Sequence, residues 1–312
     1  MEYRQLGSAG VRVSAIGLGT NTFGTERVTQ HVVDSIVNLA EDLGINLIDT
    51  ADQYSDGQSE AMLGQALKGR WEGFVVASKF YFPMGQGPND RGTSRFHLLN
   101  SLDATLRRLQ TDHVDLYYIH RWDLSTPIEE TMRALDDVVR MGKVRYLGAS
   151  VFAAWQLCKA NLLAQFRGWS PLVVLQSRYN MLDRDVEREV LPYCVAEKAG
   201  FIPYFPLAGG FLTGKYRRNQ TVPEESRGTW HPYVKDLMTP KNFDKLERLE
   251  SWCGDHGRGL NDLAQAWLLA QPQVCSIIAG ATRPEHLRSN AAAVDWQLST
   301  PELVEVKAIL DQ

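Results

Sequence analysis

The chain has 312 residues, of which 44% are hydrophobic and 22% charged, and this balance is typical of a folded protein with a substantial core. Its formal net charge of −4 gives no electrostatic reason to expect nucleic acid or a membrane surface as a partner. The chain lacks an N-terminal apolar signal region, an apolar run of roughly 20 residues and any C-x-x-C pair, so we expect a cytoplasmic protein with reduced thiols and no structural zinc.

The chain opens with a predicted β-hairpin, in which residues 2–6 and 11–15 pair across a Gly-Ser-Ala-Gly turn. Eight short apolar runs follow, and most end in a small or polar residue: AIGLGT, LIDT, FVVASK, VDLYYIH, VRYLGAS, LVVLQS, FIPYF and CSIIAG. Continuously apolar strands are typical of a parallel sheet that helices cover.

Amphipathic helices are predicted between most of these strands. They span residues 29–44, 59–69, 93–110, 127–143, 186–200 and 261–271. Gly44 is expected to end the first helix, and Pro127 to lie in the first turn of the fourth. The third helix is predicted to place one apolar face against the core, made of Phe96, Leu99, Leu102, Leu106 and Leu109.

Strand–helix repeats of this number predict an α/β fold, a closed (β/α)₈ TIM barrel that spans residues 1–312 as a single domain. The competing architecture, a doubly wound sheet, would require G-x-G-x-x-G after the first strand, where this chain has GLGTNTFG. A long loop, residues 209–240, follows the seventh strand and is rich in Gly, Pro, Arg and aromatic residues. Loops of this length are often lids or binding loops.

Ionisable side chains end three consecutive strands. Asp49, Lys79 and His120 end the second, third and fourth predicted strands, and Tyr54 follows in the loop after the second. Alone, such an Asp often caps a helix, such a Lys is solvated, and such a His is structural. Because active sites of barrels lie at the carboxyl ends of the strands, their equivalent positions favour one shared site.

This set of side chains suits carbonyl reduction. A tyrosine pKa near 10 is high for proton donation near neutrality, and a nearby ammonium lowers it. Asp49 would keep Lys79 charged despite burial, and His120 could orient a carbonyl oxygen. None of these groups can supply hydride, which implies a nicotinamide cofactor. The lysine fits a Schiff-base aldolase or lyase equally well.

Two other activities are not supported by the motifs. GGFLTGKY, from Gly209, resembles a phosphate-binding loop, but Tyr216 stands where that motif needs Ser or Thr. No H-E-x-x-H or convergent spacing of acidic and histidine residues indicates a metal site.

Aromatic residues are expected to border the mouth of the site, either as a wall that stacks on substrate or as ordinary loop packing: Phe23, Phe80, Phe82, Trp122 and Trp230.

Seven segments occur in the order found in the aldo-keto reductase superfamily: LIDTADQY, VVASK, VDLYYIHRWD, GASVF, LQSRYNML, YFPLAGGFLTGKY and IIAGATRPEHLRSN. The chain resembles this family over essentially its whole length, and most closely the bacterial branch that also resembles the β-subunits of voltage-gated potassium channels. The resemblance implies an NADP(H)-dependent oxidoreductase that reduces an aldehyde or ketone, or runs in reverse. Tyr54 would be the general acid/base, Lys79 and Asp49 would tune it, and His120 would position the carbonyl.

The resemblance also implies a binding site for the cofactor. Ser150 and Gln176 would hold the nicotinamide carboxamide, Tyr204 would stack on its ring, and Arg227 would close over the cofactor from the long loop. The remaining cofactor contacts are expected at the first two strand ends (Gly19, Thr20, Asn21, Asp49), along the pyrophosphate (Phe205, Pro206, Leu207, Gly209, Leu212, Lys215) and around the adenosine (Gly280, Thr282, Arg283, His286, Asn290).

Three positions depart from the family pattern. Val151 stands where Asn or Arg is frequent, which removes one polar contact to the cofactor. Gly280 stands where many members have lysine, so that Arg283 is the only strong cation for a 2′-phosphate, with His286 weaker; arginine pairs well with phosphate, and we expect NADPH over NADH. Gln53 replaces a bulky apolar residue.

A slow-turnover regulatory subunit that binds nicotinamide is a further alternative. Because His120 is present, catalysis is favoured over that role. We expect a small carbonyl or alcohol substrate, and no nucleic-acid or membrane partner. Members of this branch occur as monomers or as larger assemblies, and no surface predicted from the sequence indicates which of these states this protein adopts.

Overall fold

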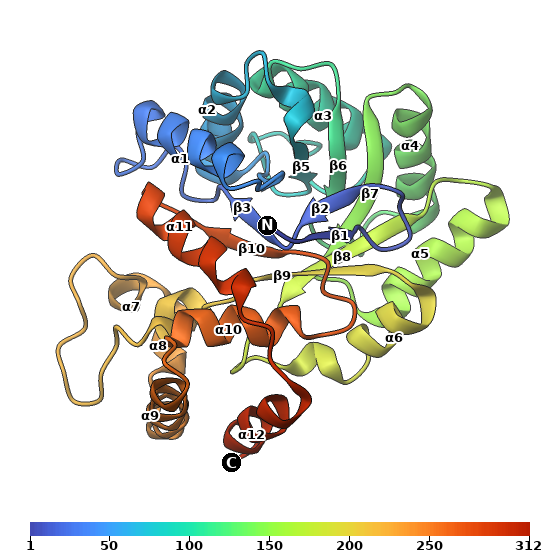
Figure 1. Cartoon of the computed structure of the whole chain (residues 1–312). Helices are drawn as coiled ribbons and strands as arrows, with labels where there is room; N and C mark the ends of the chain where they lie inside the picture. The colour runs from blue at the N-terminus through green and yellow to red at the C-terminus, as the bar shows by residue number, and fades with distance from the viewer.

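The computed structural model describes all residues from 1 to 312 and shows a closed parallel barrel surrounded by helices (Figure 1). The strands follow one another around the barrel in chain order, and the last pairs with the first to close it. The barrel strands are β3 (Ile16–Gly19), β4 (Leu47–Asp49), β5 (Val75–Phe80), β6 (Val114–Ile119), β7 (Val144–Ser150), β8 (Leu172–Arg178), β9 (Gly200–Tyr204) and β10 (Ile277–Gly280). The predicted TIM barrel is therefore confirmed.

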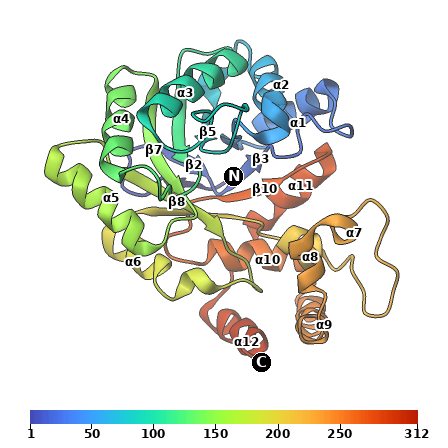
Figure 2. The ribbon, with the colours of Figure 1, turned by 180° about the vertical axis from the view of Figure 1, so that it is seen from behind.

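The predicted hairpin is also confirmed, as β1 (Tyr3–Gln5) paired antiparallel with β2 (Arg12–Ser14). It lies across the amino-terminal end of the barrel. The Ser14 backbone N–H donates to Asn46 Oδ1, just before β4, and the Asn46 backbone N–H donates to Ser14 Oγ. Arg4 donates to the backbone oxygens of Leu269 and Val274. A Cβ on Gly7 would come within 2.4 Å of the backbone nitrogen of Gly200, so the turn packs directly on the start of β9. This end of the barrel is closed, and the opposite end is shown in Figure 2.

Helices follow the strands as predicted, with differences of a few residues at their ends. The six predicted helices are α1 (Gln30–Asp42), α2 (Gln58–Ala66), α3 (Arg95–Leu109), α4 (Ile128–Arg140), α6 (Val190–Glu197) and α10 (Leu260–Leu269). Further helices are α5 (Ala154–Arg167), α7 (Arg227–Trp230), α8 (Pro232–Leu237), α9 (Pro240–Asp255), α11 (Pro284–Ala292) and α12 (Thr300–Leu310). Short 3₁₀ segments are η1 (Tyr54–Gly57), η2 (Trp71–Gly73), η3 (Asp185–Glu187), η4 (Ala208–Thr213) and η5 (Ala293–Asp295).

The long connection after the seventh barrel strand is confirmed, and it is more ordered than its composition indicates. It leaves β9 at Tyr204 and contains η4, α7 and α8 before α9 begins at Pro240. Thr239 caps α9, since its side chain accepts from the backbone N–H of Asn242 at 3.2 Å. Gly209 and Gly210 have φ of 67° and 100°, so glycine is needed to turn the chain back over the barrel.

The apolar face predicted for α3 was wrong at one end. Phe96 is 61% exposed, whereas Leu98, Leu102 and Leu109 are buried. Because Ser94 caps the helix and accepts from the N–H of His97, the first turn is fixed so that Phe96 points to solvent.

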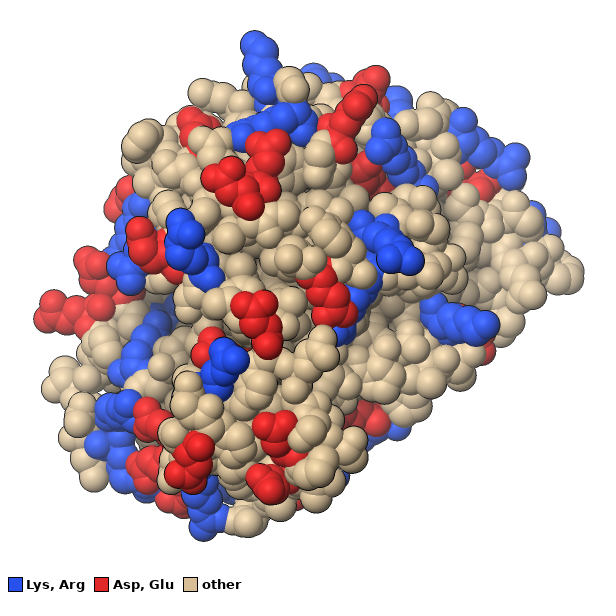
Figure 3. Space-filling model, in the orientation of Figure 1, with Lys and Arg blue, Asp and Glu red and all other residues tan.

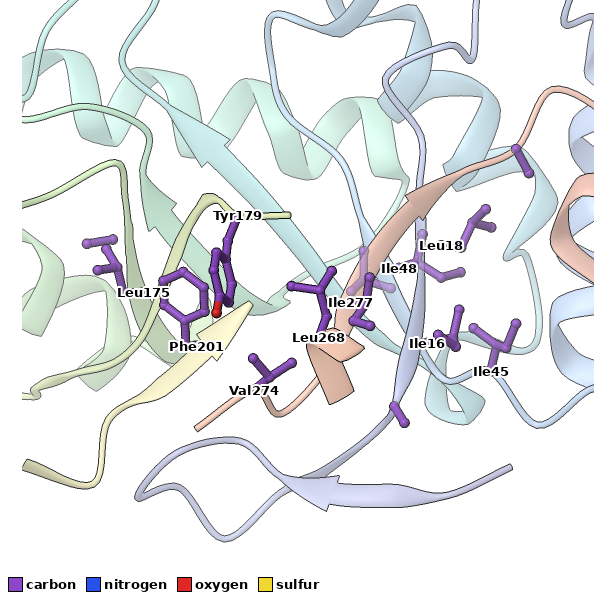
Figure 4. Close-up of a cluster of buried hydrophobic side chains, with 14 of the residues drawn as sticks. Ile16, Leu18, Ile45, Ile48, Leu175, Tyr179, Phe201, Leu268, Val274 and Ile277 are labelled. Carbon is purple, nitrogen blue, oxygen red and sulfur yellow. The ribbon is translucent and has the colours of Figure 1, made fainter. Parts of the chain in front are cut away.

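The core has two parts. The larger lies between the barrel and its helices; Figure 4 shows Ile16, Ile48 and Ile277 from barrel strands beside Leu268 of α10. The smaller fills the barrel interior and includes Tyr118. A Cβ on Gly148 would lie 2.5 Å from the Tyr118 ring, so glycine on β7 makes room for this phenol. The barrel interior is therefore a packed support for the site above it.

The surface carries both signs of charge. Lys and Arg are interspersed with Asp and Glu over the face shown in Figure 3, in keeping with a net charge of −4. No helix is long and apolar enough to cross a membrane.

Candidate active site

Side chains from consecutive strands meet at the carboxyl end of the barrel, opposite the hairpin. Lys79 Nζ on β5 donates to Asp49 Oδ1 on β4 at 2.5 Å, to the Thr50 backbone oxygen at 2.8 Å and to the Tyr54 hydroxyl oxygen at 3.3 Å. Gln176 Nε2 on β8 donates to the other carboxylate oxygen of Asp49 at 2.8 Å. The structure thus brings together three of the four predicted catalytic residues in direct contact.

Lys79 is charged although it is completely buried. Burial lowers the pKa of its amine, but the carboxylate of Asp49 and the hydroxyl of Tyr54 together outweigh this effect and hold the pKa above its ordinary value. The pair is buried on both sides, with exposed side-chain fractions of 0% for Lys79 and 4% for Asp49. A buried ammonium of this kind is a fixed positive charge that acts on the neighbouring phenol.

Tyr54 lies at the start of a strained turn. Ser55 and Asp56, which follow it directly, have φ of 49° and 53°, and Gly57 has φ of 86°. Non-glycine residues in this region cost about 1–3 kcal/mol each, and such residues cluster at functional sites. The Ser55 hydroxyl donates to the Phe23 backbone oxygen at 2.8 Å and holds the turn in place.

Lys79 lowers the pKa of Tyr54, as expected, but it does not set the net direction of the shift. Burial raises the pKa of the phenol and outweighs the opposite effect of Lys79, so the net direction is upward. Tyr54 is therefore protonated at neutral pH. An alkoxide is a much stronger base than a phenolate, so a phenol with a raised pKa can still give its proton to a carbonyl oxygen that is becoming an alkoxide.

His120 follows β6 and is 8% exposed. Burial, Lys79 and Arg121 lower the pKa of its imidazole to about 2, so the ring is neutral at any working pH. Its Nδ1 is buried without a hydrogen-bond partner, which is uncommon for a polar atom and is typical of a functional site. The rings of His120 and Tyr54 are 6.3 Å apart in an edge-to-face arrangement, which completes the predicted set.

A group of hydroxyls fixes the backbone beneath Asp49. Thr20 donates from both its backbone N–H and its hydroxyl to the Asp49 backbone oxygen, each at 3.0 Å. Ser59 Oγ donates to the Thr20 backbone oxygen at 3.0 Å and lies 2.9 Å from Thr50 Oγ1. Since Thr20 is completely buried, its hydroxyl supports the site; its cofactor contact stays a prediction.

The residues predicted to hold the nicotinamide lie beside this group. Ser150 and Gln176 are neighbours in the register of β7 and β8, and both are buried. Val151 has φ of 55°, a strained conformation for a β-branched residue, at the point where the chain leaves β7. Tyr204 is half-buried at the end of β9.

The segment predicted to line the pyrophosphate turns sharply. Phe205 and Ala208 have φ of 56° and 50°, and a Cβ on Gly209 would lie 2.4 Å from Val234 of α8. The other predicted residues of this segment are buried Pro206 and Leu212, half-buried Leu207 and exposed Lys215.

Arg227 fits an anionic ligand at this place. Its guanidinium carbon lies 5.4 Å from the centroid of the Phe205 ring, and burial lowers its pKa. No carboxylate pairs with it, although its side chain is half-buried. A desolvated guanidinium without an acid is well suited to phosphate oxygens, so the chain's residues fit the predicted cofactor.

The structure adds a cation to the predicted adenosine end. Burial, then Arg283 and then Lys215 lower the pKa of His286, so both cations are near this imidazole. The charge of Lys215, which was predicted to line the pyrophosphate, therefore also acts on the predicted adenosine end. Thr282 Oγ1 lies 3.2 Å from His286 Nδ1.

The other residues predicted for this end lie around it. Gly280 and Gly19 are paired in the barrel register, and a Cβ on Gly280 would lie 3.5 Å from Asn21 Oδ1. Asn290 is buried and accepts from Gln265 Nε2 at 3.4 Å.

The aromatic border was predicted only in part. Phe23 and Phe80 are completely buried, and Phe80 stacks on Tyr117 with ring centroids 5.0 Å apart, so these two belong to the core. Trp230 is 61% exposed on the long loop, and Phe82 and Trp122 are half-buried. Sequence reasoning did not single out Arg121, although it directly follows His120.

The site thus combines a buried ammonium–carboxylate pair with a phenol and a neutral imidazole at the carboxyl end of a TIM barrel, a set of groups that suits proton transfer. Comparison with known families agrees: the model of the aldo/keto reductase family matches residues 15–311, and the chain belongs to this family. Family membership supports an oxidoreductase that acts on small carbonyl compounds with a nicotinamide cofactor.

Three similar proteins illustrate the range of the relatives. A probable voltage-gated potassium channel subunit beta of Oryza sativa is 36% identical over 98% of this chain and 95% of its own length. An uncharacterised oxidoreductase of Bacillus subtilis is 37% identical over 96% of this chain and 92% of its own. Versiconal hemiacetal acetate reductase of Aspergillus parasiticus is 32% identical over 98% of this chain and 95% of its own length.

Proposed function

We propose that this protein is an NADPH-dependent reductase of aldehydes or ketones, which can also run in reverse, with Tyr54 as the general acid/base. The observation that carries the proposal is the position of Lys79 Nζ, which contacts Asp49, Thr50 and the Tyr54 hydroxyl at once. A family relative named as a reductase and another named as an oxidoreductase support the same chemistry.

The cofactor, when bound, supplies hydride to the carbonyl carbon. Tyr54 gives its proton to the carbonyl oxygen, and the ammonium of Lys79 stabilises the phenolate that remains. Asp49 holds Lys79 in place and Gln176 holds Asp49. Neutral His120 donates a hydrogen bond toward the carbonyl oxygen without adding a charge. In the reverse direction the phenolate takes the proton of an alcohol.

The cations near His286 support NADPH over NADH. Lys215 and Arg283 both lie near this imidazole, and no carboxylate forms an ion pair with either of them. Glu285 is the one acid whose charge reaches His286. An excess of positive charge at the adenosine end suits a 2′-phosphate, which NADH lacks.

The Schiff-base alternative is disfavoured by the charge of Lys79. An amine that attacks a carbonyl must be neutral, and such lysines have lowered pKa values. Here Asp49 raises the pKa of the amine, which keeps it protonated. The second candidate is therefore a slow, regulatory nicotinamide-binding subunit, favoured by the likeness to a protein named as a channel subunit.

The test is Tyr54→Phe. Loss of the general acid is expected to lower kcat for a simple aldehyde by about 10²–10⁴-fold. NADPH affinity, measured by fluorescence titration, should stay within about threefold of wild type, because the phenol contributes little to holding the cofactor. Turnover that is unchanged in the variant would overturn the role of Tyr54. A wild type that binds NADPH tightly without reducing any aldehyde would favour the regulatory candidate.

A further inference from the structure

Most half-buried arginines in this protein are neutralised by a carboxylate. Each of six forms an ion pair with a carboxylate: Arg4, Arg70, Arg95, Arg108, Arg184 and Arg218. Two half-buried arginines have neither an ion pair nor a side-chain hydrogen bond, namely Arg121 and Arg227. Both lie at the carboxyl end of the barrel. Leaving a partly desolvated guanidinium unpaired is costly, so each of them is expected to meet an anion that the chain does not provide.

Arg227 and Arg121 come from different parts of the site. Arg227 lies on the long loop against Phe205, where the cofactor is expected. Arg121 directly follows His120, and its guanidinium carbon lies 6.0 Å from the centroid of the Phe82 ring. The same ring stands 4.9 Å from His120 with an interplanar angle of 86°. The guanidinium and the imidazole that faces the carbonyl therefore lie against one phenyl ring.

The nearest acid along the chain does not neutralise Arg121. Asp123 Oδ1 accepts from the backbone N–H and the hydroxyl of Ser125, at 2.8 Å and 2.6 Å. Its Oδ2 accepts from the N–H and the hydroxyl of Thr93 and from Thr126 Oγ1. These bonds hold the loop after β6 in one conformation and leave the carboxylate no contact with Arg121.

We propose that Arg121 binds an anionic group, a carboxylate or a phosphate, of the carbonyl substrate. This inference rests on the proposed function and names its substrate class. The planar guanidinium offers paired N–H donors that match two oxygens of such a group. Phe82 and Trp122, both half-buried, provide apolar surface for the part of the substrate between the anion and the carbonyl.

The test compares aldehydes that differ only in the anion. The first pair is 4-carboxybenzaldehyde and its methyl ester, and the second is glyceraldehyde 3-phosphate and glyceraldehyde. Wild type is expected to prefer one anionic member by about tenfold to a hundredfold in kcat/KM, the range of a charged hydrogen bond. The pair that shows the preference identifies the anion as carboxylate or phosphate.

Arg121→Met keeps most of the aliphatic side chain and removes the charge, and should abolish the preference, so that kcat/KM becomes about equal for the charged and neutral members of the pair. The matched control is Arg133→Met, since Arg133 is exposed on α4 and has no ion pair. Arg121→Lys should retain part of the preference, which also covers the case that the methionine variant folds poorly. Equal kcat/KM for the charged and neutral members in wild type would overturn the inference and leave the reductase assignment intact.

A binding measurement decides the inference even if no aldehyde is reduced. Calorimetric titration with benzoate and with inorganic phosphate uses the anion alone. Tenfold or greater weakening of one of them in Arg121→Met, but not in Arg133→Met, supports the inference. Affinity that is the same in both variants, or no binding of either anion to wild type at millimolar concentration, contradicts it.

Discussion

Replacing Asp49 by Asn keeps the shape of the side chain and removes its charge. In the wild type the carboxylate accepts from Lys79 Nζ at 2.5 Å and from Gln176 Nε2 at 2.8 Å, and all three side chains are buried. In the variant the ammonium of Lys79 would have no counter-charge. Breaking a buried pair in this way costs about 3–5 kcal/mol. With a urea dependence of about 3 kcal/mol per molar, the denaturation midpoint should fall by roughly 1 M or more.

The pH dependence follows from the direction of the Lys79 shift. Burial lowers the pKa of Lys79, and Asp49 together with Tyr54 raises it by more, so the folded value lies above the ordinary one. The contribution of the pair is therefore fully present below the unfolded pKa and is lost as the pH rises through the folded pKa. At pH 7 the full cost of Asp49→Asn should be seen, and the difference from wild type should shrink at strongly alkaline pH.

The assay is urea denaturation followed by tryptophan fluorescence, with Lys79→Met and the double variant as partners in a mutant cycle. The double variant removes both charges, and replacing a buried pair by neutral groups is often nearly neutral. It should therefore be more stable than Asp49→Asn alone. If Asp49→Asn lies within about 1 kcal/mol of wild type, or if the two single costs simply add, the pair does not behave as a coupled buried charge.

Two further predictions concern residues outside the site. Burial, and after it the charge of Glu60, raises the pKa of Asp52 to about 7. The native state therefore holds a proton that the unfolded chain has released, so the free energy of unfolding falls as the pH rises toward 7. Asp52→Asn should remove this loss, gaining on the order of 4 kcal/mol over wild type between pH 4 and pH 8 in urea denaturation; parallel pH profiles would contradict it. Gly148→Ala should cost about 1–3 kcal/mol, because the new Cβ would lie 2.5 Å from the Tyr118 ring. Gly254→Ala, at an exposed helical position with nothing within 4 Å, should instead stabilise by up to about 1 kcal/mol; equal effects of the two would refute the packing argument.

The barrel could be predicted because its strands are continuously apolar and short, a pattern that few other folds share. Helix α5 was missed because its apolar residues lie on opposite sides. Leu157 and Ala160 are buried, whereas Leu162 and Phe166 are 59% and 83% exposed, which hides the amphipathic period. Helix α12 carried a signal that could have found it, since Ser299 and Glu302 form a capping box.

The convergence of the strand-end residues could be predicted from the sequence, and their electrostatics could not. Strand ends identify Asp49, Lys79 and His120, because the period of a barrel places them at one edge. The direction of the Tyr54 pKa depends on how burial compares with the charge of Lys79, and sequence contains no measure of burial. Arg121 was missed for the same reason, since its significance lies in the partner that it lacks.

The central claim is that hydride passes from a nicotinamide to a carbonyl carbon at this site. The most direct measurement is mass spectrometry of the alcohol formed from a simple aldehyde with NADPH that carries deuterium at both C4 positions of the nicotinamide. The reductase assignment predicts one deuterium at the carbinol carbon of the product. An alcohol without deuterium, or no alcohol at all from a protein that binds NADPH, would contradict it.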